Sequence, residues 1–302
     1  MDLQNQDLDI PTNEPLFRVI SFHELISTLE RKLLRFARVD TMIDRNEAVT
    51  SVLASETAHA FVGTDVDPLD VAKRHDLTKK SYFINCWTRD AENIAIWSIY
   101  SSNKDRVMIR TSSGKLKAAL GDLDDNTLAL DNGLFLKSKT VSNVRYVNLK
   151  DLADQWRRKA EAMRDAKRRD LEAGITDGTG PLTAKQLRSL TAGDLKTLYL
   201  SKDERYEYEQ EVRAVLEFKV RLDETKEPID PEVSFWKSSG ERTLQDSDEP
   251  PKQVFIPIGD DFIEEILVDG RMSDWEREAV DHVLQKYGMT AEVSSAFSSL
   301  YK

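Results

Sequence analysis

The stretch Tyr206-Glu-Tyr-Glu-Gln-Glu-Val-Arg-Ala-Val-Leu-Glu-Phe218 alternates between apolar and charged residues. Successive side chains of a β-strand point to opposite faces, so residues two apart share a face. One face then carries the apolar side chains, and Tyr208, Val212, Leu216 and Phe218 are expected to be buried. The other face carries Glu207, Glu209, Glu211, Arg213 and Glu217. The alternation therefore predicts a half-buried strand whose charged side chains line a cleft.

The glutamates of this stretch need compensating groups, because like charges at neighbouring positions on one face repel each other. Arg213 is one such group, and a basic or hydroxyl group across the cleft would be another. This makes Glu209 and Glu211 candidate catalytic residues. A solvated charged face without a chemical role is the alternative interpretation.

Composition limits the classes of protein to which the chain can belong. Of its 302 residues, 40% are hydrophobic and 32% are charged with both signs interspersed, which is typical of a globular protein. The net charge of −11 disfavours general binding to nucleic acid or anionic membranes. A single cysteine, no basic and apolar leader, and no apolar run of about 18 residues favour a cytoplasmic protein without a membrane partner.

Periodicity and capping signals predict an α+β fold with a mainly antiparallel core. Ser21 with Glu24 and Ser273 with Glu276 are capping boxes that predict helix starts, and Asp90 or Asn93 could cap a third helix. We expect residues 1–14 to form a loose arm and 15–302 a single domain, with a charged helical insertion at 149–197. Strands are expected at 15–21, 35–39, 82–87, 106–110, 254–258 and 266–268, a turn at 112–115, and a hairpin or strand pair within 134–147.

Metal and phosphate-loop chemistry find little support in the sequence. The four histidines, His23, His59, His75 and His282, lack metal-ligand spacing. Glycine-rich phosphate-binding motifs are absent. Cys86 lies in an apolar run and is expected to be a buried thiol rather than a nucleophile.

Three short motifs occur in a suggestive order: Phe17-Arg18, Cys86-Trp-Thr88 and Glu209-Gln-Glu211. In order and local character they resemble the arginine, serine/threonine and glutamate motifs of ADP-ribosyltransferases. The resemblance implies an ADP-ribosyltransferase-like β core and NAD as the cofactor. The second motif departs from the Ser-Thr-Ser of that family, which leaves Thr88 as its hydroxyl.

The same resemblance implies a role for each motif residue. Arg18 would bind the dinucleotide and Thr88 its nicotinamide ribose. Glu211 would stabilise positive charge on that ribose, and Glu209 would orient or deprotonate the acceptor. Arg213 would complete the binding set or neutralise the glutamates. We therefore expect Arg18, Thr88 and Glu211 to converge on one pocket.

A second resemblance covers most of the chain. Phe17-Arg18, Asp44 to Glu47, Cys86 to Tyr100, Tyr208 to Arg213 and Ile266 to Gly270 together are similar to a bacterial domain of unknown function 2971. That domain brings no established activity.

Three functions therefore stay open. They are an NAD-dependent ADP-ribosyltransferase or NAD glycohydrolase, a non-catalytic binding module of a defence or toxin system, and a metal-dependent nuclease using Asp44, Glu47 and the glutamates. The sequence leaves the acceptor and the oligomeric state undetermined.

Overall fold

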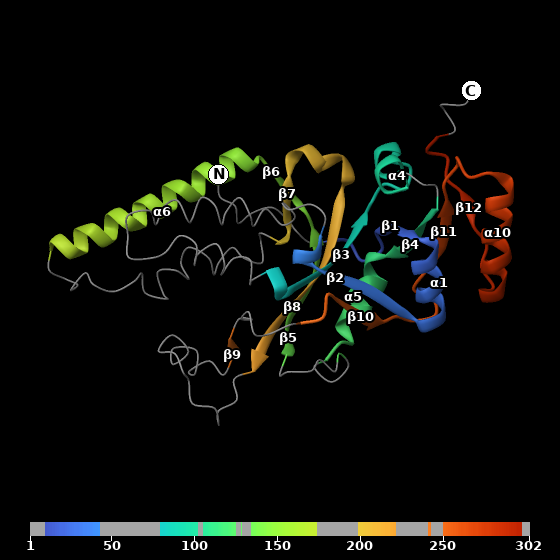
Figure 1. Ribbon diagram of the computed structural model, residues 1–302, viewed down its shortest axis with the longest axis horizontal. Coiled ribbons are helices and arrows are strands. Elements are labelled where there is room, and N and C mark those ends of the chain that lie inside the picture. The colour runs from blue at the N-terminus through green and yellow to red at the C-terminus, as the bar shows by residue number, and fades with distance from the viewer. Residues whose placement is uncertain are drawn as a thin grey trace.

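The computed structural model describes residues 10–42, 79–101, 105–124, 128, 134–173, 199–221, 241–242 and 250–297 (Figure 1). These residues form an α+β fold built on a ten-stranded sheet, in which only β11 and β12 pair in parallel. The predicted fold class, with its mainly antiparallel core, is confirmed. Along its main path the sheet consists of β10 (Gln253–Pro257), β2 (Leu33–Arg38), β3 (Tyr82–Thr88), β1 (Pro15–Ser21), β4 (Arg106–Ser112), β11 (Glu265–Val268) and β12 (Glu292–Val293).

The sheet branches at β3. One edge of β3 pairs with β8 (Glu211–Arg221) from end to end, and β8 in turn pairs with β5 (Leu134–Asn143) and β9 (Glu241–Arg242). The other edge of β3 pairs with β2 near Phe83 and with β1 at Thr88. The strands β1 and β2 therefore separate along β3 and form a fork.

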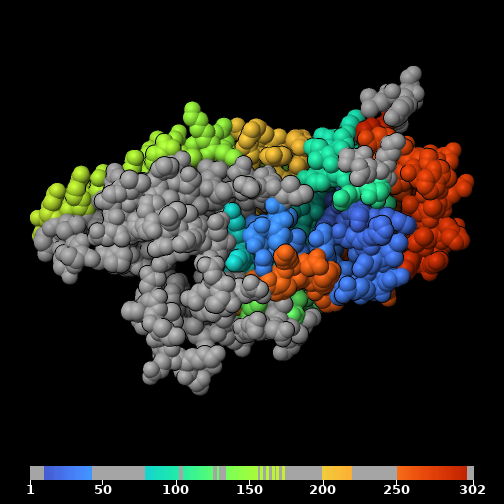
Figure 2. All heavy atoms as spheres, viewed as in Figure 1, coloured from blue at the N-terminus to red at the C-terminus, as the bar shows by residue number. Residues whose placement is uncertain are grey.

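Helices lie against both faces of the sheet. The described helices are α1 (Phe22–Arg31), α4 (Ile94–Tyr100), α5 (Ser113–Gly121), α6 (Leu149–Glu172) and α10 (Asp274–Leu284), with 3-10 helices η1 (Val39–Thr41), η3 (Glu204–Glu209) and η5 (Gln285–Tyr287). Figure 1 shows α6 projecting from the sheet on the side away from α10, and Figure 2 shows α10 and α1 at the opposite end of the molecule. Among the residues described, no helix combines the length and apolarity needed to cross a membrane.

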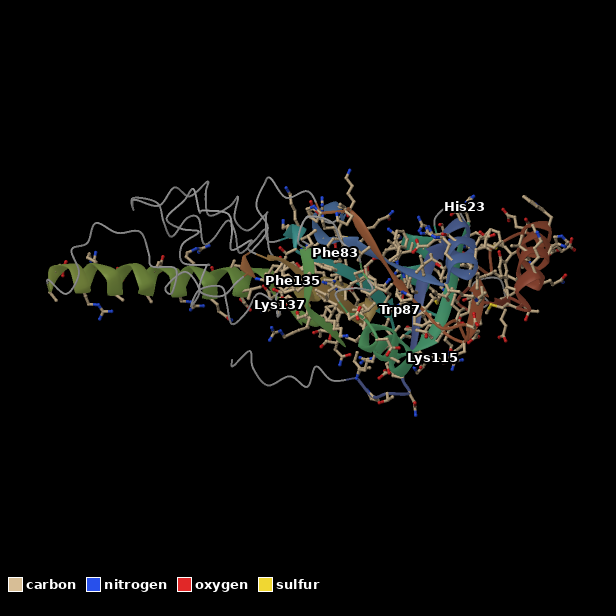
Figure 3. The ribbon with its side chains drawn as sticks, turned by 90° about the horizontal axis from the view of Figure 1, so that it is seen from below. His23, Phe83, Trp87, Lys115, Phe135 and Lys137 are labelled. Atoms are coloured by element: carbon tan, nitrogen blue, oxygen red, sulfur yellow. The ribbon has the colours of Figure 1, made fainter. Side chains whose placement is uncertain are left out.

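Apolar side chains on the two sheet faces form separate clusters. The main core includes Leu16 and Ile20 of β1, Phe83 and Trp87 of β3, and the apolar side of β8. A smaller cluster on the other face packs α4 against Phe17 and Val19. Figure 3 shows Phe83 and Trp87 inside the body and His23 at its surface.

Helix starts with local capping signals follow the sequence prediction. The hydroxyl of Ser21 accepts a hydrogen bond from the Glu24 amide at 3.1 Å, and Ser273 with Glu276 forms a capping box. Asn93 is the cap of α4. The strands predicted at 15–21, 82–87, 106–110, 254–258 and 266–268 are confirmed within a residue or two.

The alternating stretch 206–218 is only partly a strand. Val212, Leu216 and Phe218 are fully buried in β8, as predicted. Residues 206–209 instead belong to η3, which begins where the Asp203 carboxylate accepts from the Arg205 amide and ends at Gln210 in a left-handed conformation (φ 43°). Tyr208 is 36% exposed, so its predicted burial was wrong.

Three further expectations differ from the structure. Residues 112–115 start helix α5 rather than a turn, because the Ser112 hydroxyl caps the Lys115 amide. Residues 134–147 form no hairpin: β5 pairs with β8, whereas β6 (Arg145–Val147) pairs in parallel with β7 (Ser201–Asp203). Residues 10–14 contact the body, since Ile10 is buried and the Gly114 amide donates to Thr12.

The predicted charged insertion begins with α6, and residues 174–197 of it lie outside the described residues. The domain boundaries therefore stay predictions.

Candidate functional site

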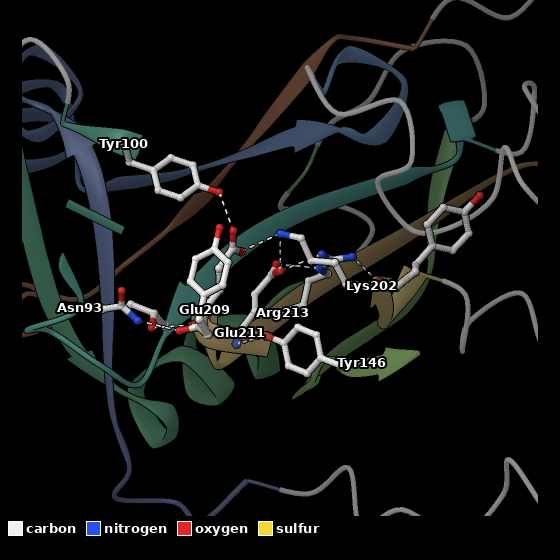
Figure 4. A network of polar contacts seen from close by, with 10 residues as sticks. Asn93, Tyr100, Tyr146, Lys202, Glu209, Glu211 and Arg213 are labelled. Atoms are coloured by element: carbon white, nitrogen blue, oxygen red, sulfur yellow. Dashed lines mark hydrogen bonds and ion pairs between the residues drawn. The ribbon is translucent and has the colours of Figure 1, made fainter. Parts of the chain in front are cut away.

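Four charged side chains meet where β8, β7 and η3 come together (Figure 4). The Lys202 ammonium lies 2.6 Å from Glu209 Oε2 and 3.2 Å from Glu211 Oε2. The Arg213 guanidinium binds Glu211 at two points, with Nε 2.8 Å from Oε1 and Nη2 2.9 Å from Oε2. We call these four residues the glutamate cluster. It pairs two carboxylates with two cations, and all four residues are buried.

Local structure explains how the cluster forms. Glu211 and Arg213 share one face of β8, opposite Thr88 and Cys86 of β3. Glu209 precedes β8, and the left-handed Gln210 turns the chain between them. Lys202 comes from β7, which belongs to the separate two-stranded sheet. The predicted pairing of Glu209 and Glu211 in space is therefore observed, although regular strand alternation does not produce it.

Electrostatics make Glu211 a firmly ion-paired carboxylate. Burial by itself would raise the pKa of Glu211, but the Arg213 and Lys202 charges outweigh burial and lower the pKa to about 2. Arg213 also donates to the Tyr199 carbonyl at 2.8 Å. Both oxygens of Glu211 are occupied by cations, so the carboxylates predicted to line a cleft are instead buried among partners.

Two tyrosine hydroxyls contact the cluster from different elements. Tyr100 of α4 donates to Glu209 Oε1 at 3.3 Å, and the Tyr146 hydroxyl of β6 accepts from the Glu211 amide at 2.7 Å. Burial raises the pKa of both tyrosines well above the ordinary value, so both hydroxyls stay protonated at neutral pH. The ring of Tyr206 lies 4.9 Å below the Lys202 ammonium.

The two carboxylates differ in the exposure of their partners. Tyr100 is 44% exposed although its hydroxyl donates to Glu209, whereas Arg213 and Lys202, the cations bound to Glu211, are both buried. Glu209 and Glu211 themselves are both buried.

The Thr88 hydroxyl lies beside the cluster but is already engaged. It donates to the Glu209 carbonyl at 2.7 Å and accepts from the Asp90 amide at 3.1 Å. Thr88 therefore ties the end of β3 to the end of η3. The structure brings Thr88, Glu209, Glu211 and Arg213 together, as expected from the sequence.

Among the described residues, Arg18 makes no hydrogen bond to the glutamate cluster. Its Nη2 lies 3.2 Å from Glu24 Oε1, and its Nη1 lies 3.5 Å from the Arg35 carbonyl. Leu16 and Ile20, on the same face of β1, belong to the main core, whereas Phe17 pairs with Thr88. The hydrogen bonds of Arg18 are therefore made at the fork, while its guanidinium still lies within electrostatic range of the Cys86 thiol. The expected convergence of Arg18, Thr88 and Glu211 on one pocket stays a prediction.

Sequence reasoning assigned no chemical role to Lys202, Tyr100 or Tyr146. Tyr100 belongs to one of the segments similar to the bacterial domain, but that similarity implies no activity, and Lys202 and Tyr146 lie in the short strands β7 and β6 outside the quoted motifs. Their role follows only from the way in which β6, β7 and α4 are placed against β8.

Metal ligation finds no support among the described residues, where no three histidine, cysteine or carboxylate side chains gather as a metal site. His59, His75, Asp44 and Glu47 lie outside the described residues. Cys86 is partly rather than fully buried, and its thiol beside Glu211 contributes to the lowered pKa of that carboxyl.

Comparisons with known proteins give little further guidance. No family model and no curated protein matches the chain. Among solved structures the chain is similar to DarT of Thermus sp. 2.9 in complex with ADP-ribosylated ssDNA, with 11% identity over 94% of each chain and a TM-score of 0.32. A TM-score this low does not establish a shared fold. The sequence resemblances to ADP-ribosyltransferases and to the bacterial domain therefore stay predictions.

Proposed function

We propose that the glutamate cluster cleaves the bond between nicotinamide and ribose in NAD, with ADP-ribose passing to an acceptor or to water. The observation that carries this proposal is the setting of Glu209. Its carboxylate is held between the Lys202 ammonium and the hydroxyl of the partly exposed Tyr100, beside the buried Glu211–Arg213 ion pair.

The chemistry needs a carboxylate in such a setting. When the glycosidic bond breaks, its electron pair leaves with the nicotinamide nitrogen and positive charge develops on the ribose, as in glycoside hydrolysis. A fixed carboxylate in a site of low dielectric stabilises that charge more strongly than water does. The nucleophile, water or an acceptor hydroxyl or amine, then forms the new bond to the ribose carbon and loses its proton.

The contacts favour Glu209 over Glu211 for the charge-stabilising role. The sequence resemblance gave that role to Glu211, but Arg213 and Lys202 occupy both oxygens of Glu211. We assign Glu211 and Arg213 to holding Lys202 and Glu209 in place. Arg18 has no assigned part in this proposal, because its hydrogen bonds go to Glu24 and the Arg35 carbonyl.

Nicotinamide release from purified protein and NAD tests the proposal. Glu209→Gln keeps the shape of the side chain and removes its charge, so we expect turnover to fall by about a hundredfold or more. Glu207→Gln is the matched control, since Glu207 is an exposed residue of the same 3-10 helix. Thermal unfolding of each variant confirms that the fold is kept.

The proposal fails if the wild-type protein releases no nicotinamide above the buffer rate. It also fails if Glu209→Gln releases nicotinamide as fast as the wild type.

A non-catalytic binding module is the second candidate, and the pairing of charges within the cluster favours it. Glu211, Arg213 and Lys202 satisfy one another, as expected of a polar network that holds a surface in one shape. This function predicts no nicotinamide release and a loss of stability, rather than of turnover, in Glu209→Gln. A role in bacterial defence or as a toxin rests on the resemblance alone.

A further inference from the structure

Helix α4 carries Tyr100 to the glutamate cluster, and it is too short to hold that position alone. It has seven residues, fewer than an isolated helix in water needs for stability. Its start is fixed by Asn93, whose Oδ1 accepts from the Ala95 and Ile96 amides. Asn93 Nδ2 also donates to the Tyr208 carbonyl at 2.6 Å, which ties the start of α4 to η3.

The end of α4 is held by an arginine from a distant part of the chain. Arg271 Nη2 lies 3.2 Å from the Trp97 carbonyl and 3.1 Å from the Ser101 carbonyl. The Trp97 carbonyl also accepts from the Ser101 amide at 2.9 Å. The last carbonyls of a helix lack the usual helical partner, and a basic side chain such as Arg271 can bind them. Tyr100 lies between these two anchored residues.

Arg271 is itself held by two further residues, Asp269 and Phe297. Asp269, which is fully buried, binds it at two points, with Nε 2.9 Å from Oδ1 and Nη2 2.6 Å from Oδ2. The guanidinium carbon lies 4.2 Å from the centre of the Phe297 ring. Such a planar, doubly bound guanidinium has little freedom to move.

The segment Ser294–Phe297 contacts α4 and the residues just before it. Phe297 packs with Ile96 and Trp97 in one apolar cluster. The hydroxyls of Ser294 and Ser295 donate to Glu92 Oε2, just before α4, at 3.0 and 2.9 Å. Residues far apart in the sequence therefore hold the helix that presents Tyr100.

We propose that Arg271 is a positioning residue, which holds the end of α4 against Phe297 and thereby sets the Tyr100 hydroxyl on Glu209. The proposal rests on the proposed function, because Glu209 is taken as the catalytic carboxylate. Without Arg271 the Ser101 carbonyl loses this donor and the Trp97 carbonyl keeps the Ser101 amide. The last turn of α4 then loosens, and Tyr100 no longer donates reliably to Glu209.

A double-mutant cycle on nicotinamide release tests the link. We expect Tyr100→Phe and Arg271→Ala each to lower turnover by about tenfold, the size expected for one hydrogen bond to a charged group. The double variant should also be about tenfold slower rather than about a hundredfold, because both changes remove the same hydrogen bond. Arg277→Ala is the control, since Arg277 pairs with Asp274 on α10 and has no contact with α4 in the hydrogen bonds of the described residues.

A readout without turnover separates this inference from the proposed function. The carboxyl carbon resonance of Glu209, assigned by its loss in Glu209→Gln, should shift in the same direction in Tyr100→Phe and Arg271→Ala, and stay in place in Arg277→Ala. This measurement decides the inference even if the wild type has no activity towards NAD.

Should Arg271→Ala fail to fold, Phe297→Leu serves instead, since it keeps an apolar side chain and removes the ring from Arg271. An unmoved Glu209 resonance in the Arg271 or Phe297 variant would overturn the proposal. So would effects of Tyr100→Phe and Arg271→Ala on turnover that multiply.

Discussion

Two groups of paired charges lie along the ten-stranded sheet, and they differ in which segments of the chain supply their residues. At the fork, Glu24 binds Arg18 at 3.2 Å and Arg35 at 3.0 Å, and all three residues belong to the continuous segment from β1 to β2. In the glutamate cluster, the partners come from β8, η3 and β7, with a tyrosine from α4.

The fork has an architectural explanation. Where β1 and β2 separate along β3, the Arg35 carbonyl loses a regular strand partner, and Asn85 and Arg18 donate to it instead. A buried carbonyl without a partner would be costly, so a mid-strand arginine is useful there without any ligand. The glutamate cluster brings more polar groups together than the sheet requires, at a desolvation cost that packing alone would avoid.

The largest expected difference between the two groups is in their response to losing an arginine. Arg213→Met keeps a long side chain but leaves Glu211 buried with one cation and the Tyr199 carbonyl without its donor. We expect a loss of about 3–5 kcal/mol in the free energy of unfolding, measured by urea denaturation. A loss below about 1 kcal/mol would show that Glu211 finds solvent or another partner.

The second largest expected effect is a loss of folding stability at low pH, caused by protonation of Glu211. The folded pKa of Glu211, about 2, lies below its ordinary value of 4.5, so its contribution to stability is fully present above pH 4.5 and is lost as the pH falls towards 2. The contribution lost is about 3 kcal/mol. Urea denaturation at several pH values should show a flatter pH dependence in Glu211→Gln than in the wild type. Equal slopes would contradict the lowered pKa.

The sequence predicts those elements of the fold whose start or end depends on residues a few positions away. Ser21 and Ser273 mark helix starts because a cap needs only residues three or four positions away. Residues 206–209 alternate as a strand would, yet Asp203 and the left-handed Gln210 place them in η3. Their period of two was a coincidence that propensity alone could not reveal.

The candidate site was predictable only on the strand that carries the motif. Glu211 and Arg213 share a face by simple alternation, and their pairing was expected. Lys202 and Tyr100 reach the cluster through the placement of β7 and α4, which no local pattern encodes. Arg18 matched a motif by its order in the sequence, whereas its hydrogen bonds are made at the fork, with Glu24 and the Arg35 carbonyl.

A smaller effect is expected at the fork. Arg18→Met removes one of two cations from Glu24, but Arg35 still binds that carboxylate and Asn85 still donates to the Arg35 carbonyl. We expect a loss of about 2 kcal/mol in urea denaturation, clearly less than in Arg213→Met. Unchanged nicotinamide release in this variant would agree with a purely structural role of Arg18 at the fork, whereas a large rise in KM for NAD would make Arg18 a binding residue, as the sequence resemblance implies.

The smallest effect is expected from removing the hydroxyl of a buried threonine, and it is tested at Thr88 and Thr111. The Thr88 hydroxyl has two partners, the Glu209 carbonyl and the Asp90 amide, whereas the Thr111 hydroxyl is fully buried with no hydrogen-bond partner among the described residues. Valine has nearly the same shape as threonine and lacks the hydroxyl. Thr88→Val should therefore lower the free energy of unfolding by about 1 kcal/mol, because it leaves two backbone groups without this partner. Thr111→Val should leave the free energy of unfolding unchanged or raise it slightly, because a buried hydroxyl without a partner only adds a desolvation cost. Thermal and urea unfolding of the two variants side by side give the difference directly, and equal effects would mean that the Thr88 hydroxyl does not tie β3 to the end of η3.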